Sequence, residues 1–118
     1  MHLSSLWLMG EKLFRFYFSH TGFRGAQFKA CNFQGCIFKE AELVAANLKN
    51  SNFKEAKFEN TLFDSAKLEG ADFEGAEFKK VIFVATDISK AKNLEATDKE
   101  ITIFNEMPEH GYFPYFIM

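Results

Sequence analysis

The sequence predicts an all-β solenoid, in which short parallel strands stack as the sides of square coils. Three observations lead to this fold class. Large apolar residues recur at every fifth position, small residues stand two positions before them, and 16 of the 118 residues are Phe, against one Trp and three Tyr. With 47% hydrophobic and 25% charged residues, a chain of this length fits a single globular domain.

The repeat runs through most of the chain. Fifteen large apolar residues follow one another at intervals of five, from Phe18 to Ile88. The members predicted to form the core stack are Phe23, Phe28, Phe33, Phe38, Leu43, Leu48, Phe53, Phe58, Phe63, Leu68, Phe73, Phe78 and Phe83. The unit is small, any, Phe or Leu, any, any, and internal repetition of this kind indicates a solenoid.

A five-residue period fits neither an α-helix nor a flat strand. Five residues of an α-helix turn through about 500°, so successive Phe side chains would drift by about 140° and share no face. On a flat strand, consecutive Phe side chains would point to opposite sides of the sheet. A chain that bends after every fifth residue buries all of them, because each unit is then one straight side with its large and small residues pointing inward.

Four such sides close a square coil. Stacking coils at about 4.8 Å, the spacing of parallel strands, places residues twenty apart directly over each other. One interior column should then consist of Phe23, Leu43, Phe63 and Phe83. Burial of each large side chain contributes about 1.5–3 kcal/mol, so this core is expected to be stable without a ligand.

The units over residues 16–90 resemble those of the pentapeptide-repeat family. Two examples are Ala71-Asp72-Phe73-Glu74-Gly75 and Ala76-Glu77-Phe78-Lys79-Lys80. Fourteen complete units in unbroken register make the resemblance specific for the fold. It implies a right-handed quadrilateral parallel β-helix with four units per coil, which gives about three and a half to four coils here.

The two ends of the chain are predicted to cover the ends of this β-helix, which would otherwise expose strand edges and apolar core. Residues 1–17 are expected to form an N-terminal cap, followed by the β-helix over residues 18–92. The register fails after Ile88, and Thr97-Asp98-Lys99-Glu100 matches the capping box that begins a helix. Residues 93–118 are therefore expected to form a short α-helix over residues 98–107 and an extended apolar tail.

No pattern of titratable residues points to catalysis or to a metal. Cys31 and Cys36 both fall on the small inward position, where they are expected to act as compact buried thiols. His2, His20 and His110 lack the spacing of metal ligands, and the carboxylates stand at outward positions. We therefore expect a protein that is not an enzyme and that has neither a cofactor nor a metal site.

The charge of the chain does not indicate a class of binding partner either. The formal net charge of −2 provides no basic footprint for nucleic acid. No apolar run approaches the about 20 residues that span a bilayer, and the N-terminal stretch lacks the features of a secretory leader. We expect no direct nucleic-acid binding, no membrane association and a cytoplasmic location.

When residues twenty apart lie over each other, two outer surfaces have a distinctive composition. Lys39, Glu59 and Lys79 should lie in one column, and Lys57 under Glu77, so that charges alternate from coil to coil. The second surface has apolar residues at outward positions, namely Val44, Leu62, Ile82 and Val84. Exposed apolar patches mark interfaces, whereas a terminal segment of the same chain packed over this face would explain it equally well.

The C-terminal segment has more apolar side chains than one square end can bury. They are Ile101, Ile103, Phe104, Met107, Tyr112, Phe113, Tyr115, Phe116, Ile117 and Met118. Pairing the segment about a two-fold axis would bury them, so we expect a homodimer through these residues. The resemblance agrees, since topoisomerase-targeting members of the family dimerise through their C-terminal ends. The alternative is a monomer whose tail folds over the outer apolar face.

These features predict a non-catalytic protein-interaction or structural module. The resemblance offers an alternative, because quinolone-resistance members of the family imitate duplex DNA and bind DNA gyrase or topoisomerase IV. Such mimicry needs negative charge along the rod, whereas residues 21–92 hold eleven Lys and Arg against ten Asp and Glu. The interaction module is therefore the first hypothesis, and a type II topoisomerase as partner is the second.

Overall fold

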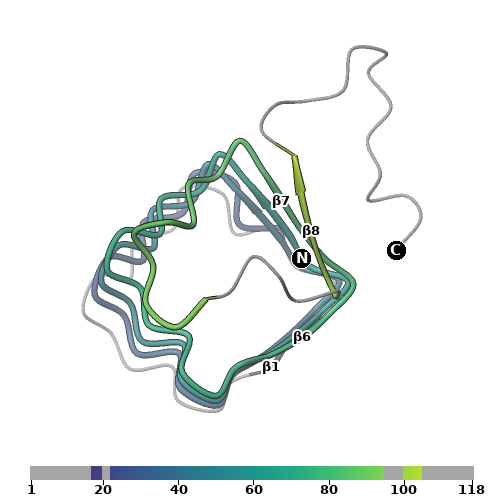
Figure 1. Ribbon diagram of the computed structural model, residues 1–118, viewed down its shortest axis with the longest axis horizontal. Helices are drawn as coiled ribbons and strands as arrows, with labels where there is room; N and C mark the ends of the chain where they lie inside the picture. The colour runs from purple at the N-terminus through teal and green to yellow at the C-terminus, as the bar shows by residue number, and fades with distance from the viewer. Residues whose placement is uncertain (1–16, 20–21, 95–99, 105–118) are drawn as a thin grey trace.

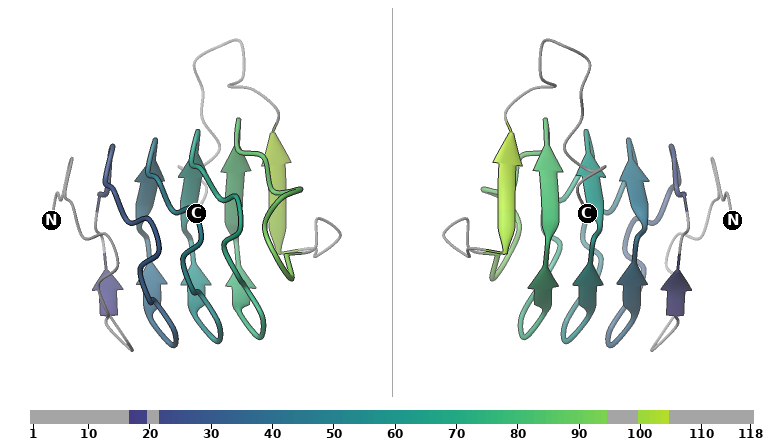
Figure 2. Two further views of the ribbon diagram at one scale, coloured as in Figure 1. Left: turned by 90° about the vertical axis from the view of Figure 1, so that its left-hand side faces the viewer. Right: turned by 90° about the vertical axis from the view of Figure 1, so that its right-hand side faces the viewer.

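A computed structural model of the protein describes residues 17–19, 22–94 and 100–104. Viewed down its axis, the chain follows a four-sided path and successive coils lie over one another (Figure 1). From the side, the coils form rows of parallel strands (Figure 2). The fold is thus the right-handed quadrilateral β-helix that the sequence predicts, and twenty-residue stacking is its organising feature.

Two adjacent sides of the square are four-stranded parallel sheets. The first has the order β1-β2-β4-β6, with strands Tyr17–Ser19, Ile37–Lys39, Lys57–Glu59 and Glu77–Lys79. The second has the order β3-β5-β7-β8, with strands Glu42–Val44, Leu62–Asp64, Val81–Val84 and Ile101–Phe104. Leu43 pairs with Phe63 and Phe63 with Phe83, which confirms the predicted interior column.

The other two sides are turns joined by isolated bridges such as Asn47 to Lys67 and Asn52 to Asp72. On these sides the carbonyl of the central residue accepts a hydrogen bond from the N–H three residues later, as Phe53 does from Ala56 at 3.1 Å. The corner residue two positions after the centre has positive φ, for example Glu55 at 59° and Gly75 at 72°. This left-handed conformation turns the chain by a right angle within each five-residue unit.

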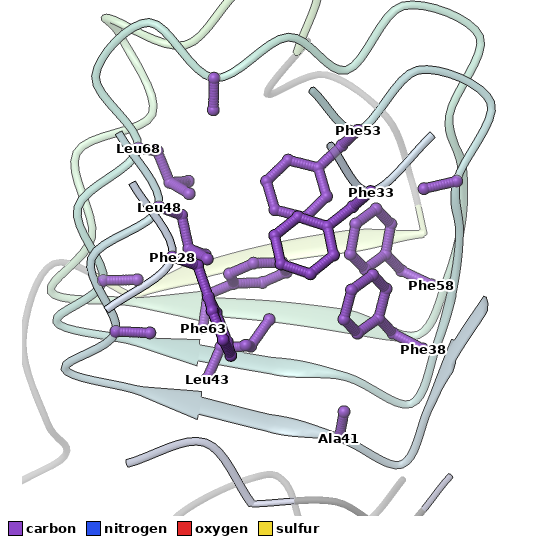
Figure 3. Packing of buried hydrophobic residues seen from close by; sticks show 14 of the residues in the cluster. Phe28, Phe33, Phe38, Ala41, Leu43, Leu48, Phe53, Phe58, Phe63 and Leu68 are labelled. Atoms are coloured by element: carbon purple, nitrogen blue, oxygen red, sulfur yellow. The ribbon is translucent and has the colours of Figure 1, made fainter. Parts of the chain in front are cut away.

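The interior is filled by columns of stacked rings (Figure 3). Phe33 and Phe53 stack at 5.0 Å between ring centroids, as do Phe38 and Phe58. All predicted core residues are buried except Phe78, which is half-buried in the last coil. Stacking of this kind adds to the energy of burial, so each coil supports the next.

Three hydroxyl groups lie in this apolar interior, on Ser51, Thr61 and Thr86. Each donates to a carbonyl of the coil below: Ser51 to Phe28, Thr61 to Phe38 and Thr86 to Phe63. A buried hydroxyl is tolerated when it is hydrogen-bonded, and here each bond also ties two coils together.

The predicted α-helix over residues 98–107 is wrong, because residues 101–104 form strand β8. This strand pairs with β7 in the twenty-residue register, Val81 with Ile101 and Phe83 with Ile103. The Ile-Thr-Ile alternation suits a strand, and pairing with β7 outweighs the local capping signal. The β-helix therefore extends beyond residue 92, whereas the predicted N-terminal cap lies almost wholly outside the described residues.

Candidate functional site

The first candidate surface is the outer face of the β1-β2-β4-β6 sheet, which bears alternating charges. Glu59 lies between Lys39 and Lys79, at 3.8 Å and 3.6 Å between charged atoms. Lys57 and Glu77 form a second pair at 3.9 Å. Both predicted columns are confirmed. Each exposed pair contributes only a few tenths of a kcal/mol up to about one. With three Lys against two Glu in these pairs, the face has no strong excess of one charge that would make it an electrostatic docking site.

The two turn sides carry a ladder of side-chain-to-backbone hydrogen bonds. Asn32, Asn47, Asn52, Asp72 and Asp87 each accept from the N–H two residues later. Such bonds favour the turn over an extended strand. These five polar side chains are thus used in holding the turns.

Two of these carboxylates have a lowered pKa. A hydrogen bond from the Asn93 side-chain amide, at 2.8 Å, is the largest cause for Asp72, with the Glu74 N–H and the charges of Lys54 and Lys92 adding to it. For Asp87, the hydroxyl and the N–H of Ser89 lower the pKa. Both groups are stabilised as anions, which is the reverse of what a general acid near neutral pH requires.

The outer apolar face is not exposed as a free interface would be. Leu62, Ile82 and Val84 are buried, and they form a small hydrophobic cluster of their own. Val44 and Phe104 are partly buried and pack against this cluster. The expectation of an exposed patch is therefore wrong for three of its four residues. Phe104, from the C-terminal segment, contributes to their burial.

The C-terminal end of the β-helix has the one large apolar side chain that is exposed among the described residues. Ile103 lies above Phe83 in an interior column, yet 38% of it is exposed. A hollow of about 430 Å³ lies beside it, lined also by residues 85–89. The last coil thus leaves part of its core accessible.

Other residues of the predicted dimer segment are used within the chain or lie outside the described part. Ile101 is buried in the main core and Phe104 packs on the outer cluster. The residues outside the described part are Met107, Tyr112, Phe113, Tyr115, Phe116, Ile117 and Met118. The sequence places Ile103 twenty residues after Phe83, which is the spacing of an interior column. Sequence reasoning missed this position because the intervening central residues, Asn93 and Asp98, are polar and interrupt the apolar repeat.

A model of the pentapeptide repeat region matches residues 11–92. The chain belongs to the pentapeptide-repeat family. No curated protein sequence matches it. Among solved structures it is similar to the pentapeptide repeat protein Rfr23 from the cyanobacterium Cyanothece 51142, with 16% identity over 90% of this chain and 86% of that one, at a TM-score of 0.50.

A second similar structure is QnrB1, a plasmid-mediated fluoroquinolone resistance protein. The identity is 24% over 75% of this chain and 56% of that one, at a TM-score of 0.55. At these identities the two likenesses show the fold alone. They agree with the square coils described above for this pentapeptide-repeat protein.

The described part of this pentapeptide-repeat protein has few side chains that could take part in a chemical reaction. Cys31 and Cys36 are buried thiols, and in residues 22–94 and 100–104 no cluster of His, Cys, Asp or Glu could hold a metal ion. The three histidines lie outside the described residues. No helix in the described ranges could cross a membrane.

Proposed function

We propose that this pentapeptide-repeat protein is a non-catalytic protein-interaction module that pairs end to end with a second copy through its last coil. The observation that carries the proposal is Ile103, a core-column residue of which 38% is exposed. In the preceding coils the next coil covers the corresponding residue, as it does for Phe63 at 0%. A partner that supplies an apolar surface over Ile103 would complete the same arrangement.

The edge of β8 supports the same contact. β8 is the last strand in the order β3-β5-β7-β8, so beyond it no strand follows among the described residues. A two-fold axis at this end would place β8 opposite its own copy in antiparallel orientation, which allows regular backbone pairing. It would also bring the two Ile103 side chains together over the exposed core.

The test compares two substitutions on one strand. Ile103→Asp places a charge at the exposed core position, whereas Thr102→Asp places the same charge on the outward face of β8, at an exposed residue. We expect sedimentation equilibrium to give about twice the chain mass of 13.6 kDa for the wild type and Thr102→Asp, and the single chain mass for Ile103→Asp.

Two outcomes would overturn the proposal. One is a wild type that stays at 13.6 kDa at high micromolar concentration. The other is an Ile103→Asp variant that remains as dimeric as the wild type. Circular dichroism of all three proteins shows whether the β-helix is retained.

The DNA-mimic alternative has less support. Residues 22–94 hold eleven Lys and Arg against ten Asp and Glu, and charges on the outer face of the first sheet are paired within the chain. Duplex DNA is uniformly anionic, so this surface does not imitate it. We expect excess protein to leave gyrase supercoiling unchanged, and inhibition of supercoiling at stoichiometric protein would restore this alternative.

A further inference from the structure

The outer face of the β3-β5-β7-β8 sheet has outward side chains that are buried, and this burial does not depend on end-to-end pairing. Leu62 and Lys57 both stand one residue before a central Phe and both point out of their sheets. The Lys57 side chain is 62% exposed, whereas Leu62 is 2% exposed. Ile82 is 5% and Val84 is 0% exposed. Outward side chains are excluded from solvent to this degree only where another segment packs over them.

The described neighbours do not provide that cover. Val44 and Phe104 pack against the cluster, but they belong to the same sheet and flank it. The register partners at the two ends of the Leu62 and Ile82 column are Glu42 and Thr102, and both are exposed. A further segment must therefore lie over the face.

The C-terminal tail, residues 105–118, has the right starting point, reach and chemistry. It follows directly after Phe104, the last residue of β8, and β8 lies beside β7 in the same sheet (Figure 2). Fourteen extended residues span about 46 Å, and three strand spacings from β8 to β3 are only about 14 Å. The tail also ends in Tyr112-Phe113-Pro114-Tyr115-Phe116-Ile117-Met118, whose rings suit a surface of Leu, Ile and Val side chains.

The N-terminal segment is the less suitable occupant. Residues 1–16 precede β1, which belongs to the other sheet and lies at the opposite end of the stack from β8. We propose that the C-terminal tail packs its aromatic side chains over Val44, Leu62, Ile82 and Val84 of the same chain. This contact closes the outer apolar face to other partners and leaves the end of the last coil for association.

The test is made on the full chain by methyl-detected NMR, so it does not depend on a variant that folds. We expect nuclear Overhauser effects from the methyl groups of Leu62, Ile82 and Val84 to ring protons of residues 112–116. Effects to residues 1–16 in their place would overturn the proposal. An isotope-filtered spectrum of mixed labelled and unlabelled chains that shows the contacts between chains would also overturn it, because a second copy would then be the cover.

A matched pair of variants adds a second measurement. In Phe113→Ser combined with Phe116→Ser, the ring-current shifts of the Leu62 and Ile82 methyl groups should be lost, whereas those of Leu43 and Leu48 in the interior should stay. Trp7→Ser is the control and should change none of the four residues. Unchanged Leu62 and Ile82 shifts in the tail variant would contradict the proposal.

Discussion

The two strand sides and the two turn sides of the square share an interior but have different outer chemistry. Inside, Phe58 of a strand side stacks on Phe38 at 5.0 Å, and Phe53 of a turn side stacks on Phe33 at the same distance. Outside, the residue before the centre is Asn or Asp at five positions of the turn sides and at none of the strand sides. Instead, the strand sides have residues such as Ile37, Leu62 and Ile82 there.

The difference shows that the residue before the centre favours one conformation of a side over the other. An Asn or Asp before the centre accepts the N–H two residues later and holds a tight turn. β-branched or long side chains at that position favour pairing with the next coil in a sheet. The inward residues fix the coil, and an Asn or Asp before the centre adds a hydrogen bond that favours a turn over a strand.

The largest expected effect tests whether the interior is really common to both kinds of side. Phe58→Ala and Phe53→Ala each remove a buried ring stacked between two others. Each should lower the free energy of unfolding by about 3–5 kcal/mol, as measured by urea denaturation. Phe78→Ala, at a half-buried residue, should cost clearly less. A turn-side loss below half the strand-side loss would contradict a shared core.

Buried hydroxyls should matter more after a strand side than after a turn side. The Thr86 hydroxyl accepts the Ala66 N–H, at 3.2 Å, whereas the Cys31 N–H donates both to Ser51 and to the Phe28 carbonyl. Thr86→Val should therefore cost about 1–3 kcal/mol and Ser51→Ala about 0.5–1.5 kcal/mol. Chemical denaturation measures both, and the reverse order would show that the turn bond does not protect the backbone.

Exchange of the outward residue tests the comparison directly. Asn52→Val removes the acceptor of the Lys54 N–H, at 2.9 Å, and should cost about 0.5–1.5 kcal/mol. Lys57→Val, at the same place on a strand side, loses only an exposed ion pair and should stay within about 0.5 kcal/mol of the wild type. Equal losses of stability in thermal denaturation would mean that the residue before the centre contributes no more on a turn side than on a strand side.

The smallest effect is the pH dependence of a turn side. Because the folded-state pKa of Asp72 is lowered from 3.8, its contribution is present above that value and is lost as the pH falls through the lower folded pKa. Asp72→Asn should thus be less stable than the wild type near pH 6, by a few tenths of a kcal/mol, and nearly equal to it near pH 2.

The cause of this shift has its own control. Asn93→Ala removes the bond that contributes most to the lowered pKa of Asp72. A carboxyl-detected NMR titration should then show the pKa of Asp72 moving up towards its ordinary value. An unchanged titration would assign the shift to the backbone and the lysines instead.

The sequence by itself determined the coil, the core columns and the ion-pair columns. A five-residue period of large and small residues repeats fourteen times, and a chain that bends after every fifth residue buries all of them. Four units per coil is what the resemblance to the pentapeptide-repeat family implies. Once residues twenty apart are stacked, the places of Lys39, Glu59 and Lys79 follow without further information. These features depend on local patterns that every unit repeats, so the sequence contains them in full.

Only the tertiary structure decided the remaining features. The capping box at residues 97–100 favours a helix, but pairing with β7 makes residues 101–104 a strand, because backbone bonds to a preformed sheet outweigh a local preference. The five-residue pattern places Leu62, Ile82 and Val84 at outward positions, yet they are buried. Burial at those positions depends on what packs over the outer face of the sheet, and no five-residue pattern records that contact.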